Sequence, residues 1–378
     1  MKIQSLTTIN FRNYSSCALS FPSMINVFYG QNAQGKTNLL EAMFYGAFGL
    51  SHRTSSEEEL MKLNCQESLV SLAFSSFTGE HEVRIKKYLQ AGRMKKEILL
   101  DRVKVKPKEH YGSLNVVMFS PEDLQLVKGE PALRRRFLDM QISQTDPLYY
   151  DLLVKYNRVL LQRNRLLKGI REGLAQAKQL LPWDEEFVQL AAALVSRRLQ
   201  ALKKLHSIAS SNYASISNNK EKLTVKYELK ANNGELLYPE EELAWAEFYR
   251  EKLLARQQVD ILRGNTGIGP HRDDLILLLD ALSLRAFGSQ GQQRSCALAL
   301  KLSQLEYVRQ EIGEFPVLLL DDVMSELDNE RRAHLLQFID GRVQTFITVN
   351  DRELIPDLAA NAYFEIVRGQ VRRAEHGR

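Results

Sequence analysis

Cysteine is scarce in this chain of 378 residues, which has only Cys17, Cys65 and Cys296. Their odd number and scattered spacing fit neither a disulfide framework nor a zinc site. The seven histidines form no ligand cluster either. No apolar run approaches the roughly 18 residues that a membrane-spanning helix needs, and the N-terminus lacks the apolar core of a signal peptide. We therefore expect a cytoplasmic protein without a membrane partner.

A strong excess of either charge is also missing, since the net charge is only +5. This mild value does not by itself indicate nucleic acid. The basic residues concentrate in a few stretches, which lie either on solvated strand edges and helix faces or against a polyanion. These stretches are residues 86–108, residues 134–136, and Arg163, Arg165, Lys168 and Arg171.

What the sequence does contain is a phosphate-binding loop that fits the pattern G-x-x-x-x-G-K-[ST] at every fixed position. An apolar run precedes this loop and a helical pattern follows it, as the motif requires. The loop's backbone N–H groups and the helix N-terminus suit phosphate oxygens, Lys36 can reach the β- and γ-phosphates, and Thr37 can ligate Mg²⁺. The sequence therefore predicts a nucleoside triphosphate site formed by Gly30, Gln31, Asn32, Ala33, Gln34, Gly35, Lys36 and Thr37.

The length suits two domains, or one large domain with an insertion. Residues 1–120 read as strands plus one helix, with antiparallel strands over 69–74, 82–89 and 97–100 and a buried strand over 114–119. Residues 121–260 are mostly helical, and α/β character returns over 261–378. There we expect strands over 274–280, 281–287, 315–320 and 344–349 and a helix over 289–311. A helical domain is thus predicted to interrupt one nucleotide-binding sheet.

Two helices of the inserted block share an apolar seam with alternating four- and three-residue steps. Tyr149, Tyr156 and Leu167 lie on the first seam, where Arg163 fills a gap, and Val188 begins the second. Gly169, Gly173 and a stop at residues 181–184 separate the helices, so we expect a short antiparallel pair. Two amphipathic helices on a globular core would explain the pattern almost as well.

Two further segments complete the expected nucleotide site. An apolar strand ends in Asp321 and Asp322, of which the first would face Mg²⁺ and the second would orient or deprotonate a water molecule. Residues 325–328 follow as a short loop, with a helix start at Asp328. Upstream, Ser289 and Gly291 open a helix whose N-terminus suits an anion.

These three segments, in this chain order, resemble the ATP-binding-cassette ATPases, which implies an α/β head with a mixed sheet. The resemblance makes residues 289–294 the signature motif and 325–328 the D-loop. In that family the signature of one subunit closes over the γ-phosphate held by another. This implies an ATP-driven homodimer with Ser289, Gly291 and Gln292 acting in trans. Thr348 lies where these ATPases place a switch residue, although their usual histidine is missing.

A narrower resemblance is to the RecF family of bacterial recombinational-repair ATPases, which are related to the heads of structural-maintenance-of-chromosomes proteins. It covers essentially the whole chain, and long coiled-coil arms are absent. The segments that carry it are residues 10–14, 37–42, 51–54, 119–124, 134–139, 269–274 and 289–294.

The RecF resemblance implies ATP and Mg²⁺ as ligands, slow hydrolysis and ATP-dependent binding of DNA, both double-stranded and at single/double-strand junctions. It places Arg12 near the adenine or α-phosphate and assigns phosphate binding to Lys36. Thr37 and Asp321 would bind Mg²⁺, and Asp322 would be the hydrolytic carboxylate. The implied partners are RecO and RecR, which promote loading of RecA at gapped DNA.

Two residues have looser assignments by the same resemblance. Arg53 is a candidate for a further phosphate or inter-subunit contact. The wider ATPase family has a glutamine after the strand that is expected here over residues 114–119, and Gln125 is the nearest candidate for it. Two other function classes stay open: a transport ATPase that docks on membrane helices, and a nuclease with an additional acidic metal cluster. The helical insertion argues against a transport ATPase. The absence of an additional acidic cluster after residue 330 argues against a nuclease.

Overall fold

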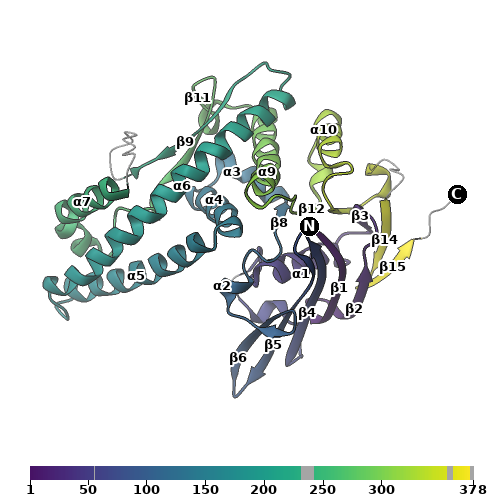
Figure 1. Cartoon of the computed structure of the whole chain (residues 1–378), viewed down its shortest axis with the longest axis horizontal. Helices are drawn as coiled ribbons and strands as arrows, with labels where there is room; N and C mark the ends of the chain where they lie inside the picture. Colours follow the sequence, from purple (N-terminus) through teal and green to yellow (C-terminus); the bar gives the residue numbers. More distant parts are fainter. Residues whose placement is uncertain (55, 231–241, 356–360, 375–378) are drawn as a thin grey trace. The chain divides into compact units, whose positions relative to one another are not determined.

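The computed structural model describes residues 1–54, 56–230, 242–355 and 361–374. The chain divides into two compact units, of which unit 1 comprises Met1–Leu124 and Leu300–Arg378, and unit 2 comprises Gln125–Ala299. The two ends of the chain therefore share one unit, to which both the purple and the yellow strands of Figure 1 belong.

A mostly parallel sheet forms one layer of unit 1, in the order β15-β14-β3-β13-β12-β8. All pairs are parallel except β14 with β15. Every residue of the neighbouring strands β8, β12 and β13 is buried, as expected for a parallel sheet that is covered on both faces. The strands are β3 (Ile25–Tyr29), β8 (Val116–Phe119), β12 (Val317–Asp321), β13 (Thr345–Val349), β14 (Asn361–Val367) and β15 (Gln370–Ala374).

An antiparallel sheet forms the second layer, in the order β2-β1-β4-β5-β6-β7. The three antiparallel strands predicted over residues 69–100 are confirmed as β4, β5 and β6. The strands are β1 (Lys2–Phe11), β2 (Tyr14–Ser20), β4 (Glu67–Ser76), β5 (Gly79–Gln90), β6 (Arg93–Leu100) and β7 (Val103–Lys104).

Helix α1 (Lys36–Phe48) contacts strands of both sheets, including β4 and β12. Most of its residues are buried, which explains why its sequence is apolar around much of its circumference. At Gly46 a side chain would lie 2.3 Å from Leu72 of β4, so glycine permits this close approach. The burial fixes the helix that carries Lys36 and Thr37 at its first turn.

Unit 1 is completed by short helices and by one longer helix. The predicted helix start at Asp328 is confirmed, since its side chain accepts a hydrogen bond from Arg331 N at 2.9 Å. The elements are η1 (Glu58–Leu60), α2 (Pro107–His110), η2 (Pro121–Leu124), η5 (Val323–Ser325), α10 (Asn329–Ile339), η6 (Arg352–Leu354) and the part of α9 (Gln290–Ile312) that follows Ala299.

Unit 2 is mostly helical and contains a small antiparallel sheet in the order β11-β10-β9. The predicted helix pair is confirmed as α5 and α6, which contact each other and bury Tyr149, Tyr156, Leu167 and Val188. The elements are α3 (Gln125–Lys128), α4 (Pro131–Thr145), α5 (Pro147–Arg171), η3 (Ala177–Leu180), α6 (Leu181–Ile216), β9 (Leu223–Glu228), α7 (Glu242–Arg263), β10 (Asp274–Leu279), β11 (Leu282–Ser283), α8 (Leu284–Phe287) and the start of α9.

Three details differ from the sequence-based expectation. The expected domain boundary at residue 260 comes too early, because β10 pairs with β9 and residues up to 299 belong to unit 2. The prediction of a strand over 281–287 is wrong, since β11 has two residues and α8 follows at once. The predicted stop at 181–184 is wrong because α6 begins there, with Pro182 in the first turn, where no N–H is needed. Within the described residues, no helix has the length and apolarity to span a membrane.

Candidate nucleotide-binding site

The loop between β3 and α1 has a backbone that its two fixed glycines make possible. Gly30 and Gly35 have φ values of 146° and 114°, which side-chain-bearing residues rarely adopt. A side chain at Gly30 would also lie 2.5 Å from Ile366 O of β14, and one at Gly35 would lie 2.9 Å from the Tyr14 hydroxyl. Glycine is therefore required here for both conformation and space.

The Lys36 ammonium is buried at the start of α1 and donates to three oxygen atoms. They are Gly30 O at 2.6 Å, Gln31 O at 2.9 Å and Asn350 Oδ1 at 2.9 Å. Burial lowers the pKa of Lys36, and the charges of Asp322 and Asp321 oppose this shift. A cation surrounded by neutral oxygen atoms in a glycine loop is suited to anionic oxygen atoms of a phosphate.

The two residues predicted to bind Mg²⁺ are in direct contact. Thr37 Oγ1 donates to Asp321 Oδ1 at 2.8 Å, and Thr348 Oγ1 donates to the same oxygen at 2.8 Å. Burial raises the pKa of Asp321, while the hydrogen bonds from Thr348 and Thr37 oppose the rise. A hydroxyl and a carboxylate converge at the end of β12, and oxygen ligands of this kind fit Mg²⁺.

Asp322 follows in a different environment. Its φ is 52°, a left-handed conformation that ends the strand and turns the chain into η5. Its N–H donates to Thr348 Oγ1 at 2.9 Å, so Thr348 bonds to both acidic residues. Thr348 is fully buried and bonds to the Asp321 carboxylate and to the Asp322 backbone N–H, whereas Asn350 is the residue of this segment that touches Lys36. The sequence predicts the switch position at Thr348 and not at Asn350, because the histidine that usually marks this position is missing.

A buried carboxylate on α1, missed in the sequence, connects the two arginines of the predicted site. Arg12 donates to Glu41 through Nε at 2.8 Å and Nη2 at 2.7 Å. Arg53 Nη1 lies 3.4 Å from Glu41 and donates to Asn38 Oδ1 at 3.0 Å. Burial raises the pKa of Glu41, but hydrogen bonds from Arg12 and Ser51 outweigh it and hold the pKa below its ordinary value.

Two turns from opposite ends of the chain contact the tip of the loop at Gln34. Its carbonyl accepts from Asn13 Nδ2 at 3.2 Å and from Gly369 N at 3.1 Å, and its side-chain oxygen accepts from Arg368 N at 2.6 Å. Tyr14 also donates to Gly35 O at 3.1 Å. The loop is therefore supported by the β1–β2 turn and the β14–β15 turn, neither of which belongs to the motif.

Comparisons with known proteins agree with this geometry. Residues 2–371 match the family model described as the RecF/RecN/SMC N terminal domain. The chain is 41% identical to "DNA replication and repair protein RecF" of Natranaerobius thermophilus, with 93% of this chain and 92% of the relative covered. It is 39% identical to the protein of the same name from Bacillus subtilis, with 92% and 93% covered. The chain belongs to the RecF family.

A solved structure described as the recombination mediator protein RecF-ATP in the RecFOR pathway matches with a TM-score of 0.90 and 35% identity, covering 99% of this chain and 98% of that one. An Smc head bound to the C-winged helix domain of ScpA matches at 15% identity, with a TM-score of 0.57 and 99% and 97% coverage. This second likeness shows the fold alone. The expected α/β fold of an ATP-binding-cassette head is thereby confirmed.

The residues expected to form the signature motif of this RecF-family chain open α9 with a reciprocal cap. Gln292 N donates to Ser289 Oγ at 3.2 Å, and Ser289 N donates to Gln292 Oε1 at 2.7 Å. The Gln292 amide also donates to Glu221 at 2.6 Å. Ser289 is exposed and Gly291 half-buried. Of the loosely assigned residues, Gln125 is the exposed first residue of α3.

Parts of the basic stretches have carboxylate partners inside the protein. Arg134 is buried and donates to both oxygens of Asp274, at 2.7 Å and 2.8 Å. Lys87 is buried in an ion pair with Glu57 at 2.5 Å, and Lys96 pairs with the same carboxylate at 2.9 Å. A solvated cluster is therefore the wrong interpretation for Arg134 and Lys87, which stabilise the fold.

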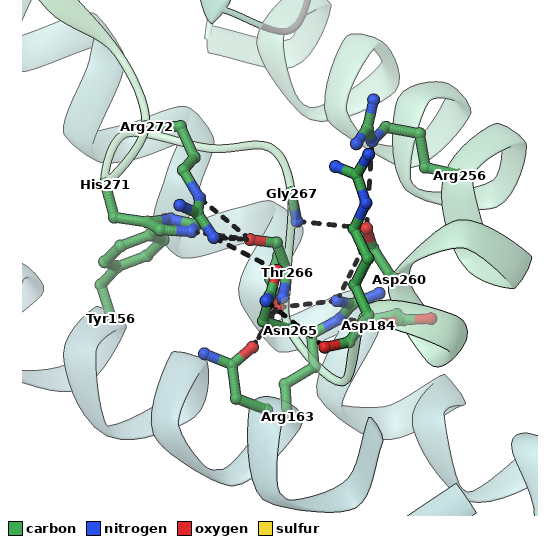
Figure 2. A network of polar contacts seen from close by, with 12 residues as sticks. Tyr156, Arg163, Asp184, Arg256, Asp260, Asn265, Thr266, Gly267, His271 and Arg272 are labelled. Atoms are coloured by element: carbon green, nitrogen blue, oxygen red, sulfur yellow. Dashed lines mark hydrogen bonds and ion pairs between the residues drawn. The ribbon is translucent and has the colours of Figure 1, made fainter. Parts of the chain in front are cut away.

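Arg163, which fills the gap in the α5 seam, is fully buried in a polar network (Figure 2). It donates to Asp184 at 2.7 Å, to Thr266 Oγ1 at 2.7 Å and to Asp260 at 3.2 Å. His271 of the 269–274 segment bonds to Thr266 O at 3.1 Å. Most of this segment is therefore buried in unit 2, although Arg272 is exposed.

A second buried guanidinium, that of Arg198, contacts the same segment. Arg198 donates to both oxygens of Asp139 at 3.0 Å and to Pro270 O at 2.7 Å. Tyr227 accepts from Arg198 at 3.0 Å and donates to Asp273 at 2.9 Å. Burial raises the pKa of Asp273 to about 7, against the opposing charge of Arg198.

Proposed function

We propose that this protein binds and slowly hydrolyses ATP, and that nucleotide binding controls its action on DNA during replication and recombinational repair. The convergence of Lys36, Thr37 and Asp321 at the end of a parallel sheet carries the proposal. Its relatives are described as DNA replication and repair proteins, and two solved relatives are described with ATP or ATPrS. Nothing in these names supports the transport alternative.

In this proposal Lys36 binds the phosphates, and the N–H groups of Gly30 to Gly35 surround them. Thr37 and Asp321 would hold Mg²⁺, which supplies neutralisation of charge on the phosphate oxygens. Asp322 would orient the attacking water and accept its proton. The different environments of the two carboxylates support this division, because Asp321 is buried and accepts from two hydroxyls, whereas Asp322 is half-buried and starts the turn into η5.

The proposed partners are DNA, RecO and RecR, because solved relatives are described in the RecFOR pathway. Candidate DNA contacts are the exposed basic residues in and near the β5–β6 hairpin that have no ion pair within the described part of the chain: Arg93, Lys95, Arg102, Lys106 and Lys108. Replacing Arg93 and Lys95 by Gln should weaken DNA binding and lower the slope of log affinity against log salt by about 0.9 for each lost phosphate contact. An unchanged slope would place the DNA surface elsewhere.

The ATP proposal is tested by replacing Lys36 with Ala. We expect ATP binding and ATP-dependent dimerisation to be lost, because the phosphates lose their main cation. Calorimetry and sedimentation with and without a non-hydrolysable analogue measure both. Lys95→Ala, in an exposed lysine of β6, is the matched control and should bind ATP normally. ATP-driven dimers of Lys36→Ala would refute the assignment.

Dimerisation through the signature is tested at Ser289. In the proposed homodimer, Ser289, Gly291 and Gln292 face the γ-phosphate held by the other subunit. The exposure of Ser289 supports this role, since its cap uses only one hydroxyl hydrogen bond. Ser289→Arg should leave ATP binding by monomers intact and prevent dimers. Normal dimerisation of this variant would leave Ser289 as a helix cap alone.

A further inference from the structure

Glu41 is a fully buried carboxylate directly beneath the first turn of α1. It follows Thr37 by one helical turn, so both residues lie on the same face of the helix. Its oxygens accept from Arg12 at 2.7 Å and 2.8 Å and from Ser51 Oγ at 2.6 Å. Arg53 lies 3.4 Å away. The β1–β2 turn, which carries Arg12, and the loop after α1 therefore meet at one carboxylate.

The side chain of Arg12 is more strongly constrained than that of Arg53. Arg12 makes paired hydrogen bonds with Glu41 and donates through Nη1 to Glu59 O at 2.7 Å, and its side chain is 17% exposed. Arg53 has a long contact with Glu41, and its side chain is 46% exposed. A guanidinium carries more N–H groups than these contacts use. Both cations thus keep N–H groups that these contacts do not use.

We propose that Glu41 is a positioning residue of the nucleotide site, which fixes Arg12 and guides Arg53 so that both present their remaining N–H groups to the triphosphate. This inference rests on the proposed ATP binding. Glu41 itself does not touch the nucleotide, because its carboxylate is fully covered. Fixing one guanidinium rigidly reduces the ordering that nucleotide binding requires.

The sign of the effect distinguishes positioning from two simpler roles. If Glu41 only neutralised positive charge, removing its charge would strengthen the attraction for ATP. If it only stabilised the fold, its removal would lower stability without changing ATP affinity. Positioning predicts weaker binding, since the arginines lose their orientation while their charges stay.

The experiment measures the ATP dissociation constant by calorimetry, and unfolding in urea without nucleotide, for wild-type protein and two variants of Glu41. Glu41→Gln should raise the dissociation constant about tenfold, as expected when charge-assisted hydrogen bonds are lost. Glu41→Asp keeps the charge but withdraws the carboxylate by one methylene group, and should also weaken binding. Glu58→Gln removes an exposed carboxylate of η1 instead, so the ATP affinity of this control should match that of wild type.

A double-substitution cycle identifies the route of the effect. In a background of Arg12→Gln and Arg53→Gln, the further change Glu41→Gln should leave ATP affinity unchanged, since no guanidinium remains to be positioned. Tighter binding by Glu41→Gln, or normal binding by both Glu41 variants, would overturn the inference. Normal binding by Lys36→Ala would instead contradict the phosphate-loop assignment, so the two failures differ.

Discussion

Replacing Arg134 by Gln is expected to destabilise unit 2 strongly, although its sequence context is that of a basic cluster. The guanidinium is 4% exposed and forms paired hydrogen bonds with Asp274. It also donates to Leu126 O and Gly129 O, both at 3.0 Å. These contacts join α3, α4 and β10, so the substitution affects three elements at once.

The size of the effect follows from what the substitution leaves behind. Asp274 would stay buried with one backbone donor, Leu275 N at 2.7 Å. Removing one partner of a buried ion pair costs ~3–5 kcal/mol because the other charge is left uncompensated. Domains are stable by only ~5–15 kcal/mol. We therefore expect a large shift of the urea midpoint, and a smaller one when Asp274→Leu is combined with Arg134→Met.

Tryptophan fluorescence can follow this unit selectively, because the chain has two tryptophans and both, Trp183 and Trp245, lie in unit 2. Trp245 is buried, so its emission should shift to longer wavelength on unfolding. Arg136→Gln, in an exposed neighbour, is the control and should change stability by less than about 0.5 kcal/mol. Unchanged stability of Arg134→Gln with reduced DNA affinity would refute the structural role.

Two further predictions concern carboxylates. Asp322→Asn should retain ATP and Mg²⁺ but hydrolyse ATP slowly and accumulate as the dimer. Asp321→Asn should also raise the Mg²⁺ concentration needed for binding. Equal losses of nucleotide affinity in the two variants would contradict their different roles. Because burial raises the pKa of Asp273 to about 7, the unfolded chain loses this proton at a lower pH than the folded protein does, so stability falls as pH rises from about 4 to about 7. The stability of wild type relative to Asp273→Asn should therefore fall over this range in urea titrations, and a constant difference would show that the pKa is not raised.

Local patterns predicted the site's main components because each depends on neighbours in sequence. The phosphate loop needs glycines at fixed spacing, and Lys36 and Thr37 follow them on the same helix. Asp321 could be placed because an apolar run that ends in acidic residues is typical of a parallel strand's carboxyl end. The meeting of Thr37 with Asp321 confirms that these two segments belong together.

The contacts that sequence analysis missed join segments far apart in the chain. Asn350 contacts Lys36 across 314 residues, and Arg368 contacts Gln34 across 334. Glu41 looked like an ordinary polar residue of a helix, because its burial depends on a second sheet covering α1. The boundary after residue 260 failed for a related reason: the strand pattern of β10 was visible, but its partner β9 was not.

The buried cations limit where DNA can bind. Affinity for a polyanion arises largely from the release of counterions by cations that face solvent. Arg134, Arg163 and Arg198 do not face solvent, and each has a carboxylate partner within unit 2. Lys87 is likewise buried against Glu57 in unit 1. Counting basic residues along the sequence therefore overstates the charge available to DNA, and only the exposed cations, such as Arg93 and Lys95, can contribute to the salt dependence.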